Sequence, residues 1–121
     1  MLRALMLRKK INDAKKEIEA LRAKDSDFET RAADIQKRTD DTAKAIEEAQ
    51  TEEEKQVVEE NIAAIEADKA ALDSEKAEND QKIADLEGEV SEMEKELEDV
   101  EDQQRASQKV LTQEPENTVT Q

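Results

Sequence analysis

The stretch "IEEAQTEEEKQVV", residues 46–58, decides the fold, because two long heptad patterns meet in it out of phase. The pattern before it places Ile46 at a core position, and the pattern after it places Ile62 at the equivalent position. Sixteen residues separate the two, which is two more than two heptads. Coiled coils absorb insertions of three or four residues, whereas a two-residue shift rotates the core stripe away from its partner. The pattern therefore argues against one continuous rod.

A turn between two helices explains the phase shift. Thr51 and Glu54 have the spacing of a capping box, in which both side chains bond free backbone N–H groups at a helix start. We predict that one helix stops near Gln50 and that another starts after Thr51. The predicted fold class is all-α: a long antiparallel helical hairpin or coiled coil with a flexible C-terminal tail. Residues 1–105 form the coiled-coil domain, with a first arm at 2–49 and a second arm at 52–104, and residues 106–121 form the tail or a linker.

Each arm carries a row of core positions with alternating steps of three and four residues, as in a coiled coil. In the first arm they are Ala4, Leu7, Ile11, Ala14, Ile18, Leu21, Asp25, Phe28, Ala32, Ile35, Thr39, Thr42, Ile46 and Ala49. In the second they are Val58, Ile62, Ile65, Lys69, Leu72, Lys76, Asn79, Ile83, Leu86, Val90, Met93, Leu97 and Val100. We predict a register in which the numbers of facing residues add to 104. This register sets Asp25 against Asn79, so that neither polar residue faces hydrocarbon, and we predict that they form a register-setting pair.

The residues that flank the core support antiparallel pairing of the arms. They are mostly basic in the first arm and almost all acidic in the second: residues 1–24 carry eight bases and three acids, and residues 47–102 carry five bases and twenty-three acids. A parallel homodimer of the second arm would set acid against acid along its length, which is unfavourable. The register also predicts two like-charge contacts, Glu17 near Glu89 and Lys24 near Lys82.

The composition argues against a catalytic or metal-binding function. Of 121 residues 44% are charged, with one Gly, one Pro, one Phe and no Trp, Tyr, His or Cys. Thiol and imidazole catalysis and the usual zinc ligands are therefore missing, and we expect no enzyme, no cofactor and no metal site. No apolar run approaches the ~20 residues that cross a bilayer, and "MLRALML" is too short for a signal-peptide core. We expect a soluble intracellular protein that binds neither membranes nor, for want of aromatic stacking residues, nucleic acid.

Three local features leave alternatives open. Leu2, Leu5 and Met6 lie off the core row, so they either pack near Leu97 and Val100 or contact another subunit. "AKDSDFE", residues 23–29, has a second capping-box pattern, but the heptad phase continues through it, which favours a weak spot within one helix. Past Gln104 the heptad fades, and a protease acting there would meet chain that is not held in a packed core. The candidate cleavage segment is Gln103, Gln104, Arg105, Ala106, Ser107, Gln108, Lys109 and Val110.

The opening "MLRALMLRKKINDAKKEIEALRAKDSDFETRAADI", the turn "TEEEKQVVEE" and the Glu-rich second arm carry a family resemblance. Together, over roughly residues 1–105, they resemble the amino-terminal delta (scaffolding) domain of tailed-phage major capsid proteins of the HK-ninety-seven-like family. The most specific part is "LRALMLRKKI" with "LRAKDSDFE", whereas an acidic arm alone would match many coiled coils.

The resemblance implies a function and partners. A delta domain is fused ahead of the shell-forming domain, directs procapsid assembly from inside the shell and is removed by the phage maturation protease. The expected partners are other copies of the capsid subunit and that protease, with the portal protein as a further candidate. The expected location is the procapsid interior, assembled in the bacterial host cytoplasm. The alternatives are a structural coiled-coil spacer and a chaperone-like helical hairpin.

Overall fold

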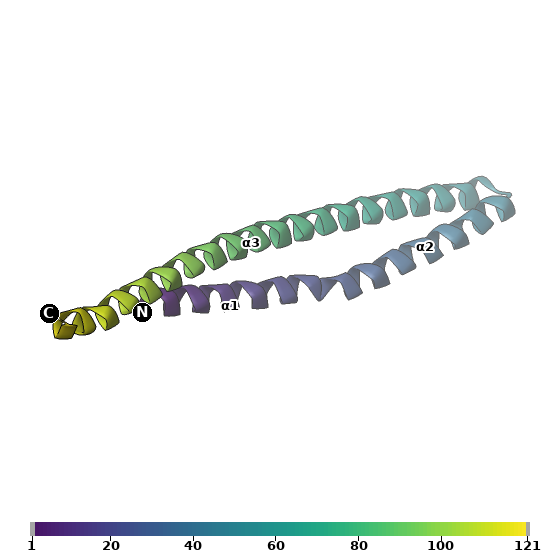
Figure 1. Ribbon diagram of the computed structural model, residues 1–121. Coiled ribbons are helices and arrows are strands. Elements are labelled where there is room, and N and C mark those ends of the chain that lie inside the picture. Colours follow the sequence, from purple (N-terminus) through teal and green to yellow (C-terminus); the bar gives the residue numbers. More distant parts are fainter. Residues whose placement is uncertain (1, 121) are drawn as a thin grey trace. The chain divides into compact units, whose positions relative to one another are not determined.

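The computed structural model describes the backbone of residues 2–120 and the side chains of residues 2–108. It contains three helices in chain order: α1 (Leu2–Arg22), α2 (Lys24–Glu48) and α3 (Glu52–Thr120) (Figure 1). No strand occurs in the described part of the chain. The all-α helical hairpin predicted from the heptad phases is confirmed, and the turn lies between α2 and α3, where the phase shift placed it.

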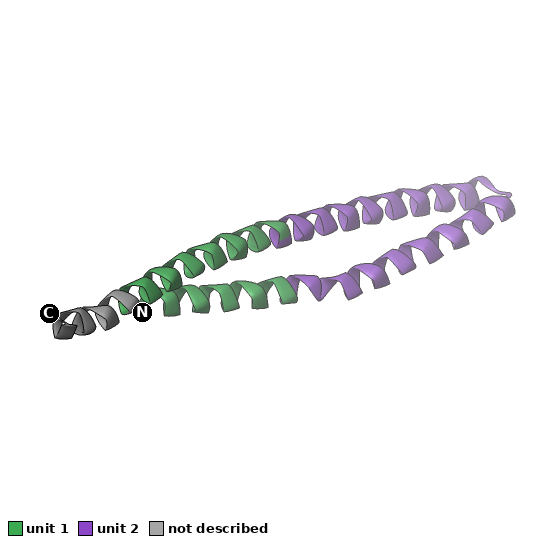
Figure 2. Ribbon diagram, viewed as in Figure 1, with its two compact units in different colours: residues 1–19, 84–121 green, residues 20–83 purple. Residues whose placement is uncertain are grey.

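The chain divides into two compact units, which we describe separately (Figure 2). Unit 1 comprises residues 1–19 and 84–121, and unit 2 comprises residues 20–83. In unit 1, α1 and α3 run antiparallel: Arg8 pairs with Glu101 and Lys15 with Glu94, so a step of seven residues up one helix matches a step of seven down the other.

The same antiparallel arrangement holds α2 against the first half of α3 in unit 2. Arg31 pairs with Glu75 and Arg38 with Asp68, again seven residues forward on one helix and seven back on the other. Unit 2 also contains the turn, so it is a closed hairpin in which both arms and their connection belong to one compact body.

The ion pairs fix the register at the predicted value. If the residue numbers of two facing core positions add to 104, the residue numbers of facing flanking positions in an antiparallel coiled coil add to 99 or 106 on one side of the seam. On the other side they add to 102 or 109. In unit 1 the residue numbers of the ion pair Arg3–Glu96 add to 99. Those of Arg8–Glu101 and of Lys15–Glu94 each add to 109. If one arm were shifted by one heptad, the new register would allow either the sum of 99 or the sum of 109, but not both. In unit 2 both pairs add to 106, which the register also allows.

The predicted core row of α3 is buried or half-buried from Val58 to Val100, except at Lys69 and Lys76. Both lysines are exposed, because a long side chain can hold its ammonium in water while its methylene groups cover the seam. In the first arm the row is buried from Ala4 to Leu21 and again at Phe28. An apolar stripe of this kind is what stabilises long, highly charged helices.

Beyond Phe28 the buried row of α2 departs from the prediction. Ala32, Thr39 and Ile46 are exposed, whereas the residue before each of them, Arg31, Arg38 and Ala45, is half-buried. If position 25, which is itself exposed, is counted as the expected core position between Leu21 and Phe28, the row takes two successive three-residue steps, from 25 to 28 and from 28 to 31. Such steps overwind a coiled coil locally. The overwinding coincides with Ala23, a turn residue between α1 and α2 whose ψ of −21° is close to the 3₁₀ value. The expectation of an unbroken row is wrong here.

The start of α2 and the end of α3 bear on two further predictions. Ser26 does not cap a helix: α2 already begins at Lys24, and its amino-terminal cap position, Ala23, makes no side-chain cap hydrogen bond. The weak-spot interpretation of residues 23–29 is the one that holds. At the other end α3 does not stop near Gln104 but continues to Thr120, since helical hydrogen bonds are local and need no partner arm. The predicted tail, residues 106–121, thus begins inside α3, and its side chains from residue 109 onward lie outside the described residues.

Candidate interaction surfaces

The candidate functional features of the described part of the chain are surfaces of the hairpin. No group of acidic residues in this part could hold a metal ion. Two of its hollows are open grooves between the arms, and a third is lined by α3 residues between Val100 and Gln108. Within the same part, no helix combines the length and the apolar character that a bilayer-crossing helix needs. The sequence singled out four features of the hairpin: the turn, the seam near Asn79, the amino-terminal tip and the predicted cleavage segment.

The turn is capped by the predicted residues. The Thr51 hydroxyl oxygen accepts a hydrogen bond from the Glu54 N–H at 3.1 Å. The Glu54 carboxylate accepts from the N–H of Gln50 at 3.1 Å, one residue earlier than an ideal capping box would have it. On the other side, Ala49 has extended backbone, with ψ 120°, and its N–H still bonds the Ala45 carbonyl at 2.9 Å. The turn thereby satisfies backbone groups on both helices that meet in it.

Two polar residues are buried in the seam, Thr42 and Asn79, and Asn79 lines the same hollow as Phe28, the only aromatic residue of the sequence. Asn79, 4% exposed, donates from its side-chain nitrogen to the Leu21 carbonyl at 3.0 Å, and its Oδ1 has no partner among the described residues. Leu21 lies in the last turn of α1, where carbonyl groups begin to lose their helical partners. Asn79 therefore supplies a donor to α1 just before the bend at Ala23.

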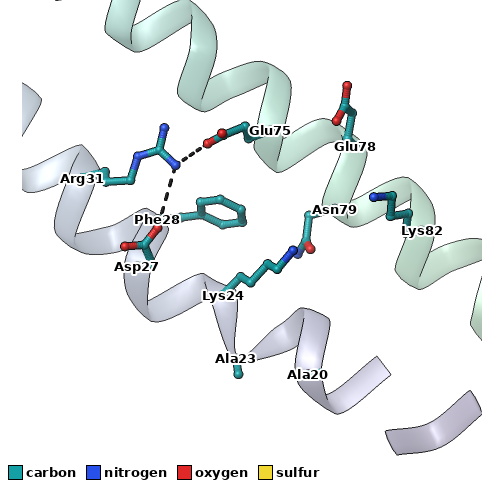
Figure 3. A pocket seen from close by; sticks show the side chains of 10 residues that line it. All are labelled: Ala20, Ala23, Lys24, Asp27, Phe28, Arg31, Glu75, Glu78, Asn79 and Lys82. Carbon is teal, nitrogen blue, oxygen red and sulfur yellow. Dashed lines mark hydrogen bonds and ion pairs between the residues drawn. The ribbon is translucent and has the colours of Figure 1, made fainter. Parts of the chain in front are cut away.

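An open hollow of about 590 Å³ surrounds this residue in unit 2 (Figure 3). Phe28 points across it toward α3, and the Arg31 guanidinium at its rim bonds Glu75 and pairs with Asp27. Lys24 and Lys82 line the same hollow, which is the like-charge neighbourhood that the register predicts. The side chain of Lys24 runs toward Asn79 (Figure 3).

The predicted pair of Asp25 with Asn79 is not formed. Asp25 is exposed, and the amide of Asn79 bonds a backbone carbonyl instead. The physical reason is the cost of burying an ionised carboxylate, which an amide partner does not offset. The overwinding near Ala23 turns the α2 core row outward at this position and so lets Asp25 remain in water.

Ion pairs across the seam are numerous but exposed. Arg3 pairs with Glu96, Arg8 with Glu101 and Lys15 with Glu94 in unit 1, and Arg31 with Glu75 and Arg38 with Asp68 in unit 2. Their side chains are between about a third and two thirds exposed. Exposed pairs contribute roughly 0–1 kcal/mol each, so their main effect is to disfavour other registers and parallel pairing.

The amino-terminal tip is unpartnered on its outer face. Leu2, Leu5 and Met6 are 71%, 63% and 52% exposed, so more than half of each residue's surface is uncovered. Ala4 and Leu7, between them, are buried in unit 1. The exposure of Leu2, Leu5 and Met6 favours contact with another molecule over packing within the chain, and that contact stays a prediction.

The described part of the predicted cleavage segment, Gln103–Gln108, is helical rather than extended. Gln104 is half-buried as the last core position of α3, and residues 105–108 are exposed. Lys109 and Val110 lie outside the residues whose side chains are described. A protease would here have to unwind a helix that no arm covers, and such a helix has little stability of its own.

Sequence reasoning missed one surface. Six residues of α3 that face away from the seam are small and exposed; they are Ala63, Ala64, Ala67, Ala70, Ser74 and Ala77. Their outward heptad positions were the available signal, because surface positions of such a charged helix are otherwise occupied by Glu, Asp, Lys and Gln.

Comparison with known proteins adds no further identification. No protein-family model, no curated protein and no solved structure matches this chain. Its function has to be argued from its own residues.

Proposed function

We propose that this chain is the amino-terminal scaffolding (delta) domain of a tailed-phage major capsid protein of the HK-ninety-seven-like family. In this role it directs procapsid assembly from inside the shell and is then removed by the maturation protease. The observation that carries the proposal is the antiparallel hairpin with a basic first arm and an acidic second arm, built on an opening sequence that resembles that domain.

The charge distribution supports a temporary role. Residues 47–102 carry a net charge of −18, from five bases and twenty-three acids. Many of these acids are exposed and unpaired, such as Glu92, Glu98 and Asp99 in unit 1. Dense negative charge inside a shell repels the phosphates of incoming DNA. A hairpin useful in assembly would hinder packaging, which gives proteolytic removal a physical reason.

The partners follow from the exposed features. Other copies of the capsid subunit would contact the tip, where Leu2, Leu5 and Met6 are exposed to solvent. The maturation protease would act on residues 103–110, a segment that includes the last covered position of the seam, Gln104. The portal protein is a further candidate partner, and the location is the procapsid interior in the bacterial host cytoplasm. A structural spacer or chaperone-like hairpin needs neither the protease nor a fused shell domain.

The test is made in the full-length capsid protein. Deletion of residues 2–102 should abolish ordered procapsids, and multiple substitutions through residues 103–110 should trap uncleaved procapsids that package poorly. Electron microscopy and gel analysis of the particles measure both effects. Gly88→Ala is the matched control, since a Cβ at this exposed position meets nothing within 4 Å, and it should assemble and mature normally.

Regular, DNA-filled shells formed without the hairpin would contradict the proposal, and the spacer would replace it. A reading frame that continues past Gln121 into an α/β shell domain beside a protease gene is the supporting observation to seek. A frame that encodes a different kind of domain would favour the spacer or the chaperone-like hairpin.

A further inference from the structure

The outer face of α1 at its amino end is a second apolar stripe, opposite the buried seam. We name it the tip stripe; it consists of Leu2, Leu5, Met6 and Lys9. The spacing i, i+3, i+4, i+7 places all four side chains on one face of the helix, and all four are exposed. Packed helices use this spacing to contact a neighbour, so the stripe is a helix-docking face with no helix on it in unit 1.

The basic residues of the tip are electrostatically complementary to an acidic partner. Residues 1–12 contain Arg3, Arg8, Lys9 and Lys10 and no acid. Arg3 and Arg8 already pair with α3 of unit 1, whereas Lys9 pairs with none of the residues whose side chains are described. Two tips placed face to face would bring four such uncompensated lysines together, counting Lys10 of each copy, so self-pairing of this stripe is electrostatically unfavourable.

The same chain carries a face with the complementary size and charge. We name it the alanine face; it consists of Ala63, Ala64, Ala67 and Ala70 on the outer side of α3 in unit 2. Small side chains let a second helix approach closely, and bulky leucine and methionine side chains fill the space that small ones leave. Exposed acids border the alanine face at both ends and along one edge, namely Glu60, Glu78, Glu66 and Asp73.

The spacing of these acids matches the stripe. Lys9 lies seven residues after Leu2, and Glu60 lies seven residues before Ala67. An antiparallel contact with Leu2 over Ala67 therefore brings Lys9 to Glu60. None of the four bordering acids has a partner within the described side chains, so each is available to a lysine of another molecule.

We propose that the tip stripe of one copy docks on the alanine face of a second copy. The contact is heterologous, with a different surface on each molecule, so every copy keeps one free stripe and one free face and association continues into open chains or closed rings. A single contact of this size is below the area of stable complexes and is weak. The inference concerns the isolated chain and holds whether or not a shell domain follows.

Two blocked variants test the proposal. Leu5→Glu with Met6→Glu blocks the stripe, and Ala64→Arg with Ala67→Arg blocks the face. All four positions are exposed, and arginine forms helices nearly as well as alanine, so both variants should keep the parent's circular dichroism spectrum. In sedimentation velocity the parent should show an average mass that rises with concentration. Each blocked variant alone should stay monomeric, with association weakened by on the order of ten-fold or more.

The decisive sample is the equimolar mixture of the two blocked variants. One still has its alanine face and the other its tip stripe, so the mixture should form a species of twice the monomer mass and nothing larger. The proposal is overturned if the mixture stays monomeric while the parent associates, or if the face variant alone associates as the parent does, which would indicate contact between two tips. A monomeric parent that binds vesicles of phosphatidylcholine and phosphatidylserine through the stripe would also overturn it.

Cross-linking gives an independent readout, because the chain has no native cysteine. A mixture of Leu5→Cys and Ala64→Cys chains, two positions that face each other in this contact, should oxidise to a 5–64 disulfide between molecules. Gly88→Cys, exposed and on the outer face of α3 in unit 1, is the control partner and should cross-link to Leu5→Cys far less. Equal yields with both partners would mean random collision and would overturn the docking geometry.

Discussion

Replacement of Asn79 by leucine is expected to stabilise the hairpin, although the residue makes the best-defined polar contact of the seam. The change removes the hydrogen bond from the Asn79 side chain to the Leu21 carbonyl, 3.0 Å long. It also removes the buried Oδ1, which has no partner in the described part of the chain. The net effect therefore depends on one satisfied and one unsatisfied polar atom of the same side chain.

The magnitude follows from three contributions. A lost hydrogen bond costs about 1 kcal/mol net, and removal of a buried unsatisfied acceptor returns about 1–3 kcal/mol. Full burial of a leucine side chain contributes about 1.5–3 kcal/mol, of which the open hollow beside Phe28 permits only part. We expect the free energy of unfolding to rise by about 2 kcal/mol, with looser discrimination between registers, because a single buried polar residue helps to specify register.

Urea unfolding followed by circular dichroism measures the change, since the chain has no Trp or Tyr for fluorescence. Asn79→Asp is the matched control: it keeps the shape but cannot donate to Leu21 and buries a charge, so it should destabilise strongly. Asp25→Leu tests the pairing in a double-mutant cycle, and the coupling between positions 25 and 79 should be under about 0.5 kcal/mol. An Asn79→Leu chain less stable than the parent, or a coupling above about 1 kcal/mol, would refute the reasoning.

Spin labels on cysteines introduced at Arg8 and Glu94 should lie within ~20 Å in one molecule, since Arg8 and Lys15 are seven residues apart on α1 and Lys15 pairs with Glu94. Labels over ~100 Å apart, as in a straight helix at 1.5 Å per residue, would contradict the hairpin, and short distances only between molecules would indicate swapped arms. Thr51→Ala should lower the free energy of unfolding by about 1 kcal/mol, because the cap of α3 is lost. Thr39→Ala is its control: the Thr39 hydroxyl only donates back to Ile35 within the helix, so an equal loss of stability there would show that the cap is not the cause.

The sequence by itself determined the turn, the register and the pairing of opposite charges. Each rests on a signal repeated many times: the heptad phase is set by more than a dozen core positions in each arm, and the flanking charges test the same register again. Because so many residues agree, one exception such as Lys69 or Asp25 does not move the result. The cap of Thr51 and Glu54 was likewise predictable, since it depends on residues adjacent in the chain.

The tertiary structure alone decided where the first arm departs from its pattern. A single residue in a tighter conformation, Ala23 with ψ −21°, precedes a rotation of the buried row, which exposes Ile46 and half-buries Arg38. The sequence cannot reveal this, because both rows satisfy helical geometry and the choice depends on packing against the other arm. The partner of Asn79 was hidden for the same reason: a backbone carbonyl of the facing helix has no signature in the sequence, and only the three-dimensional arrangement places it within reach.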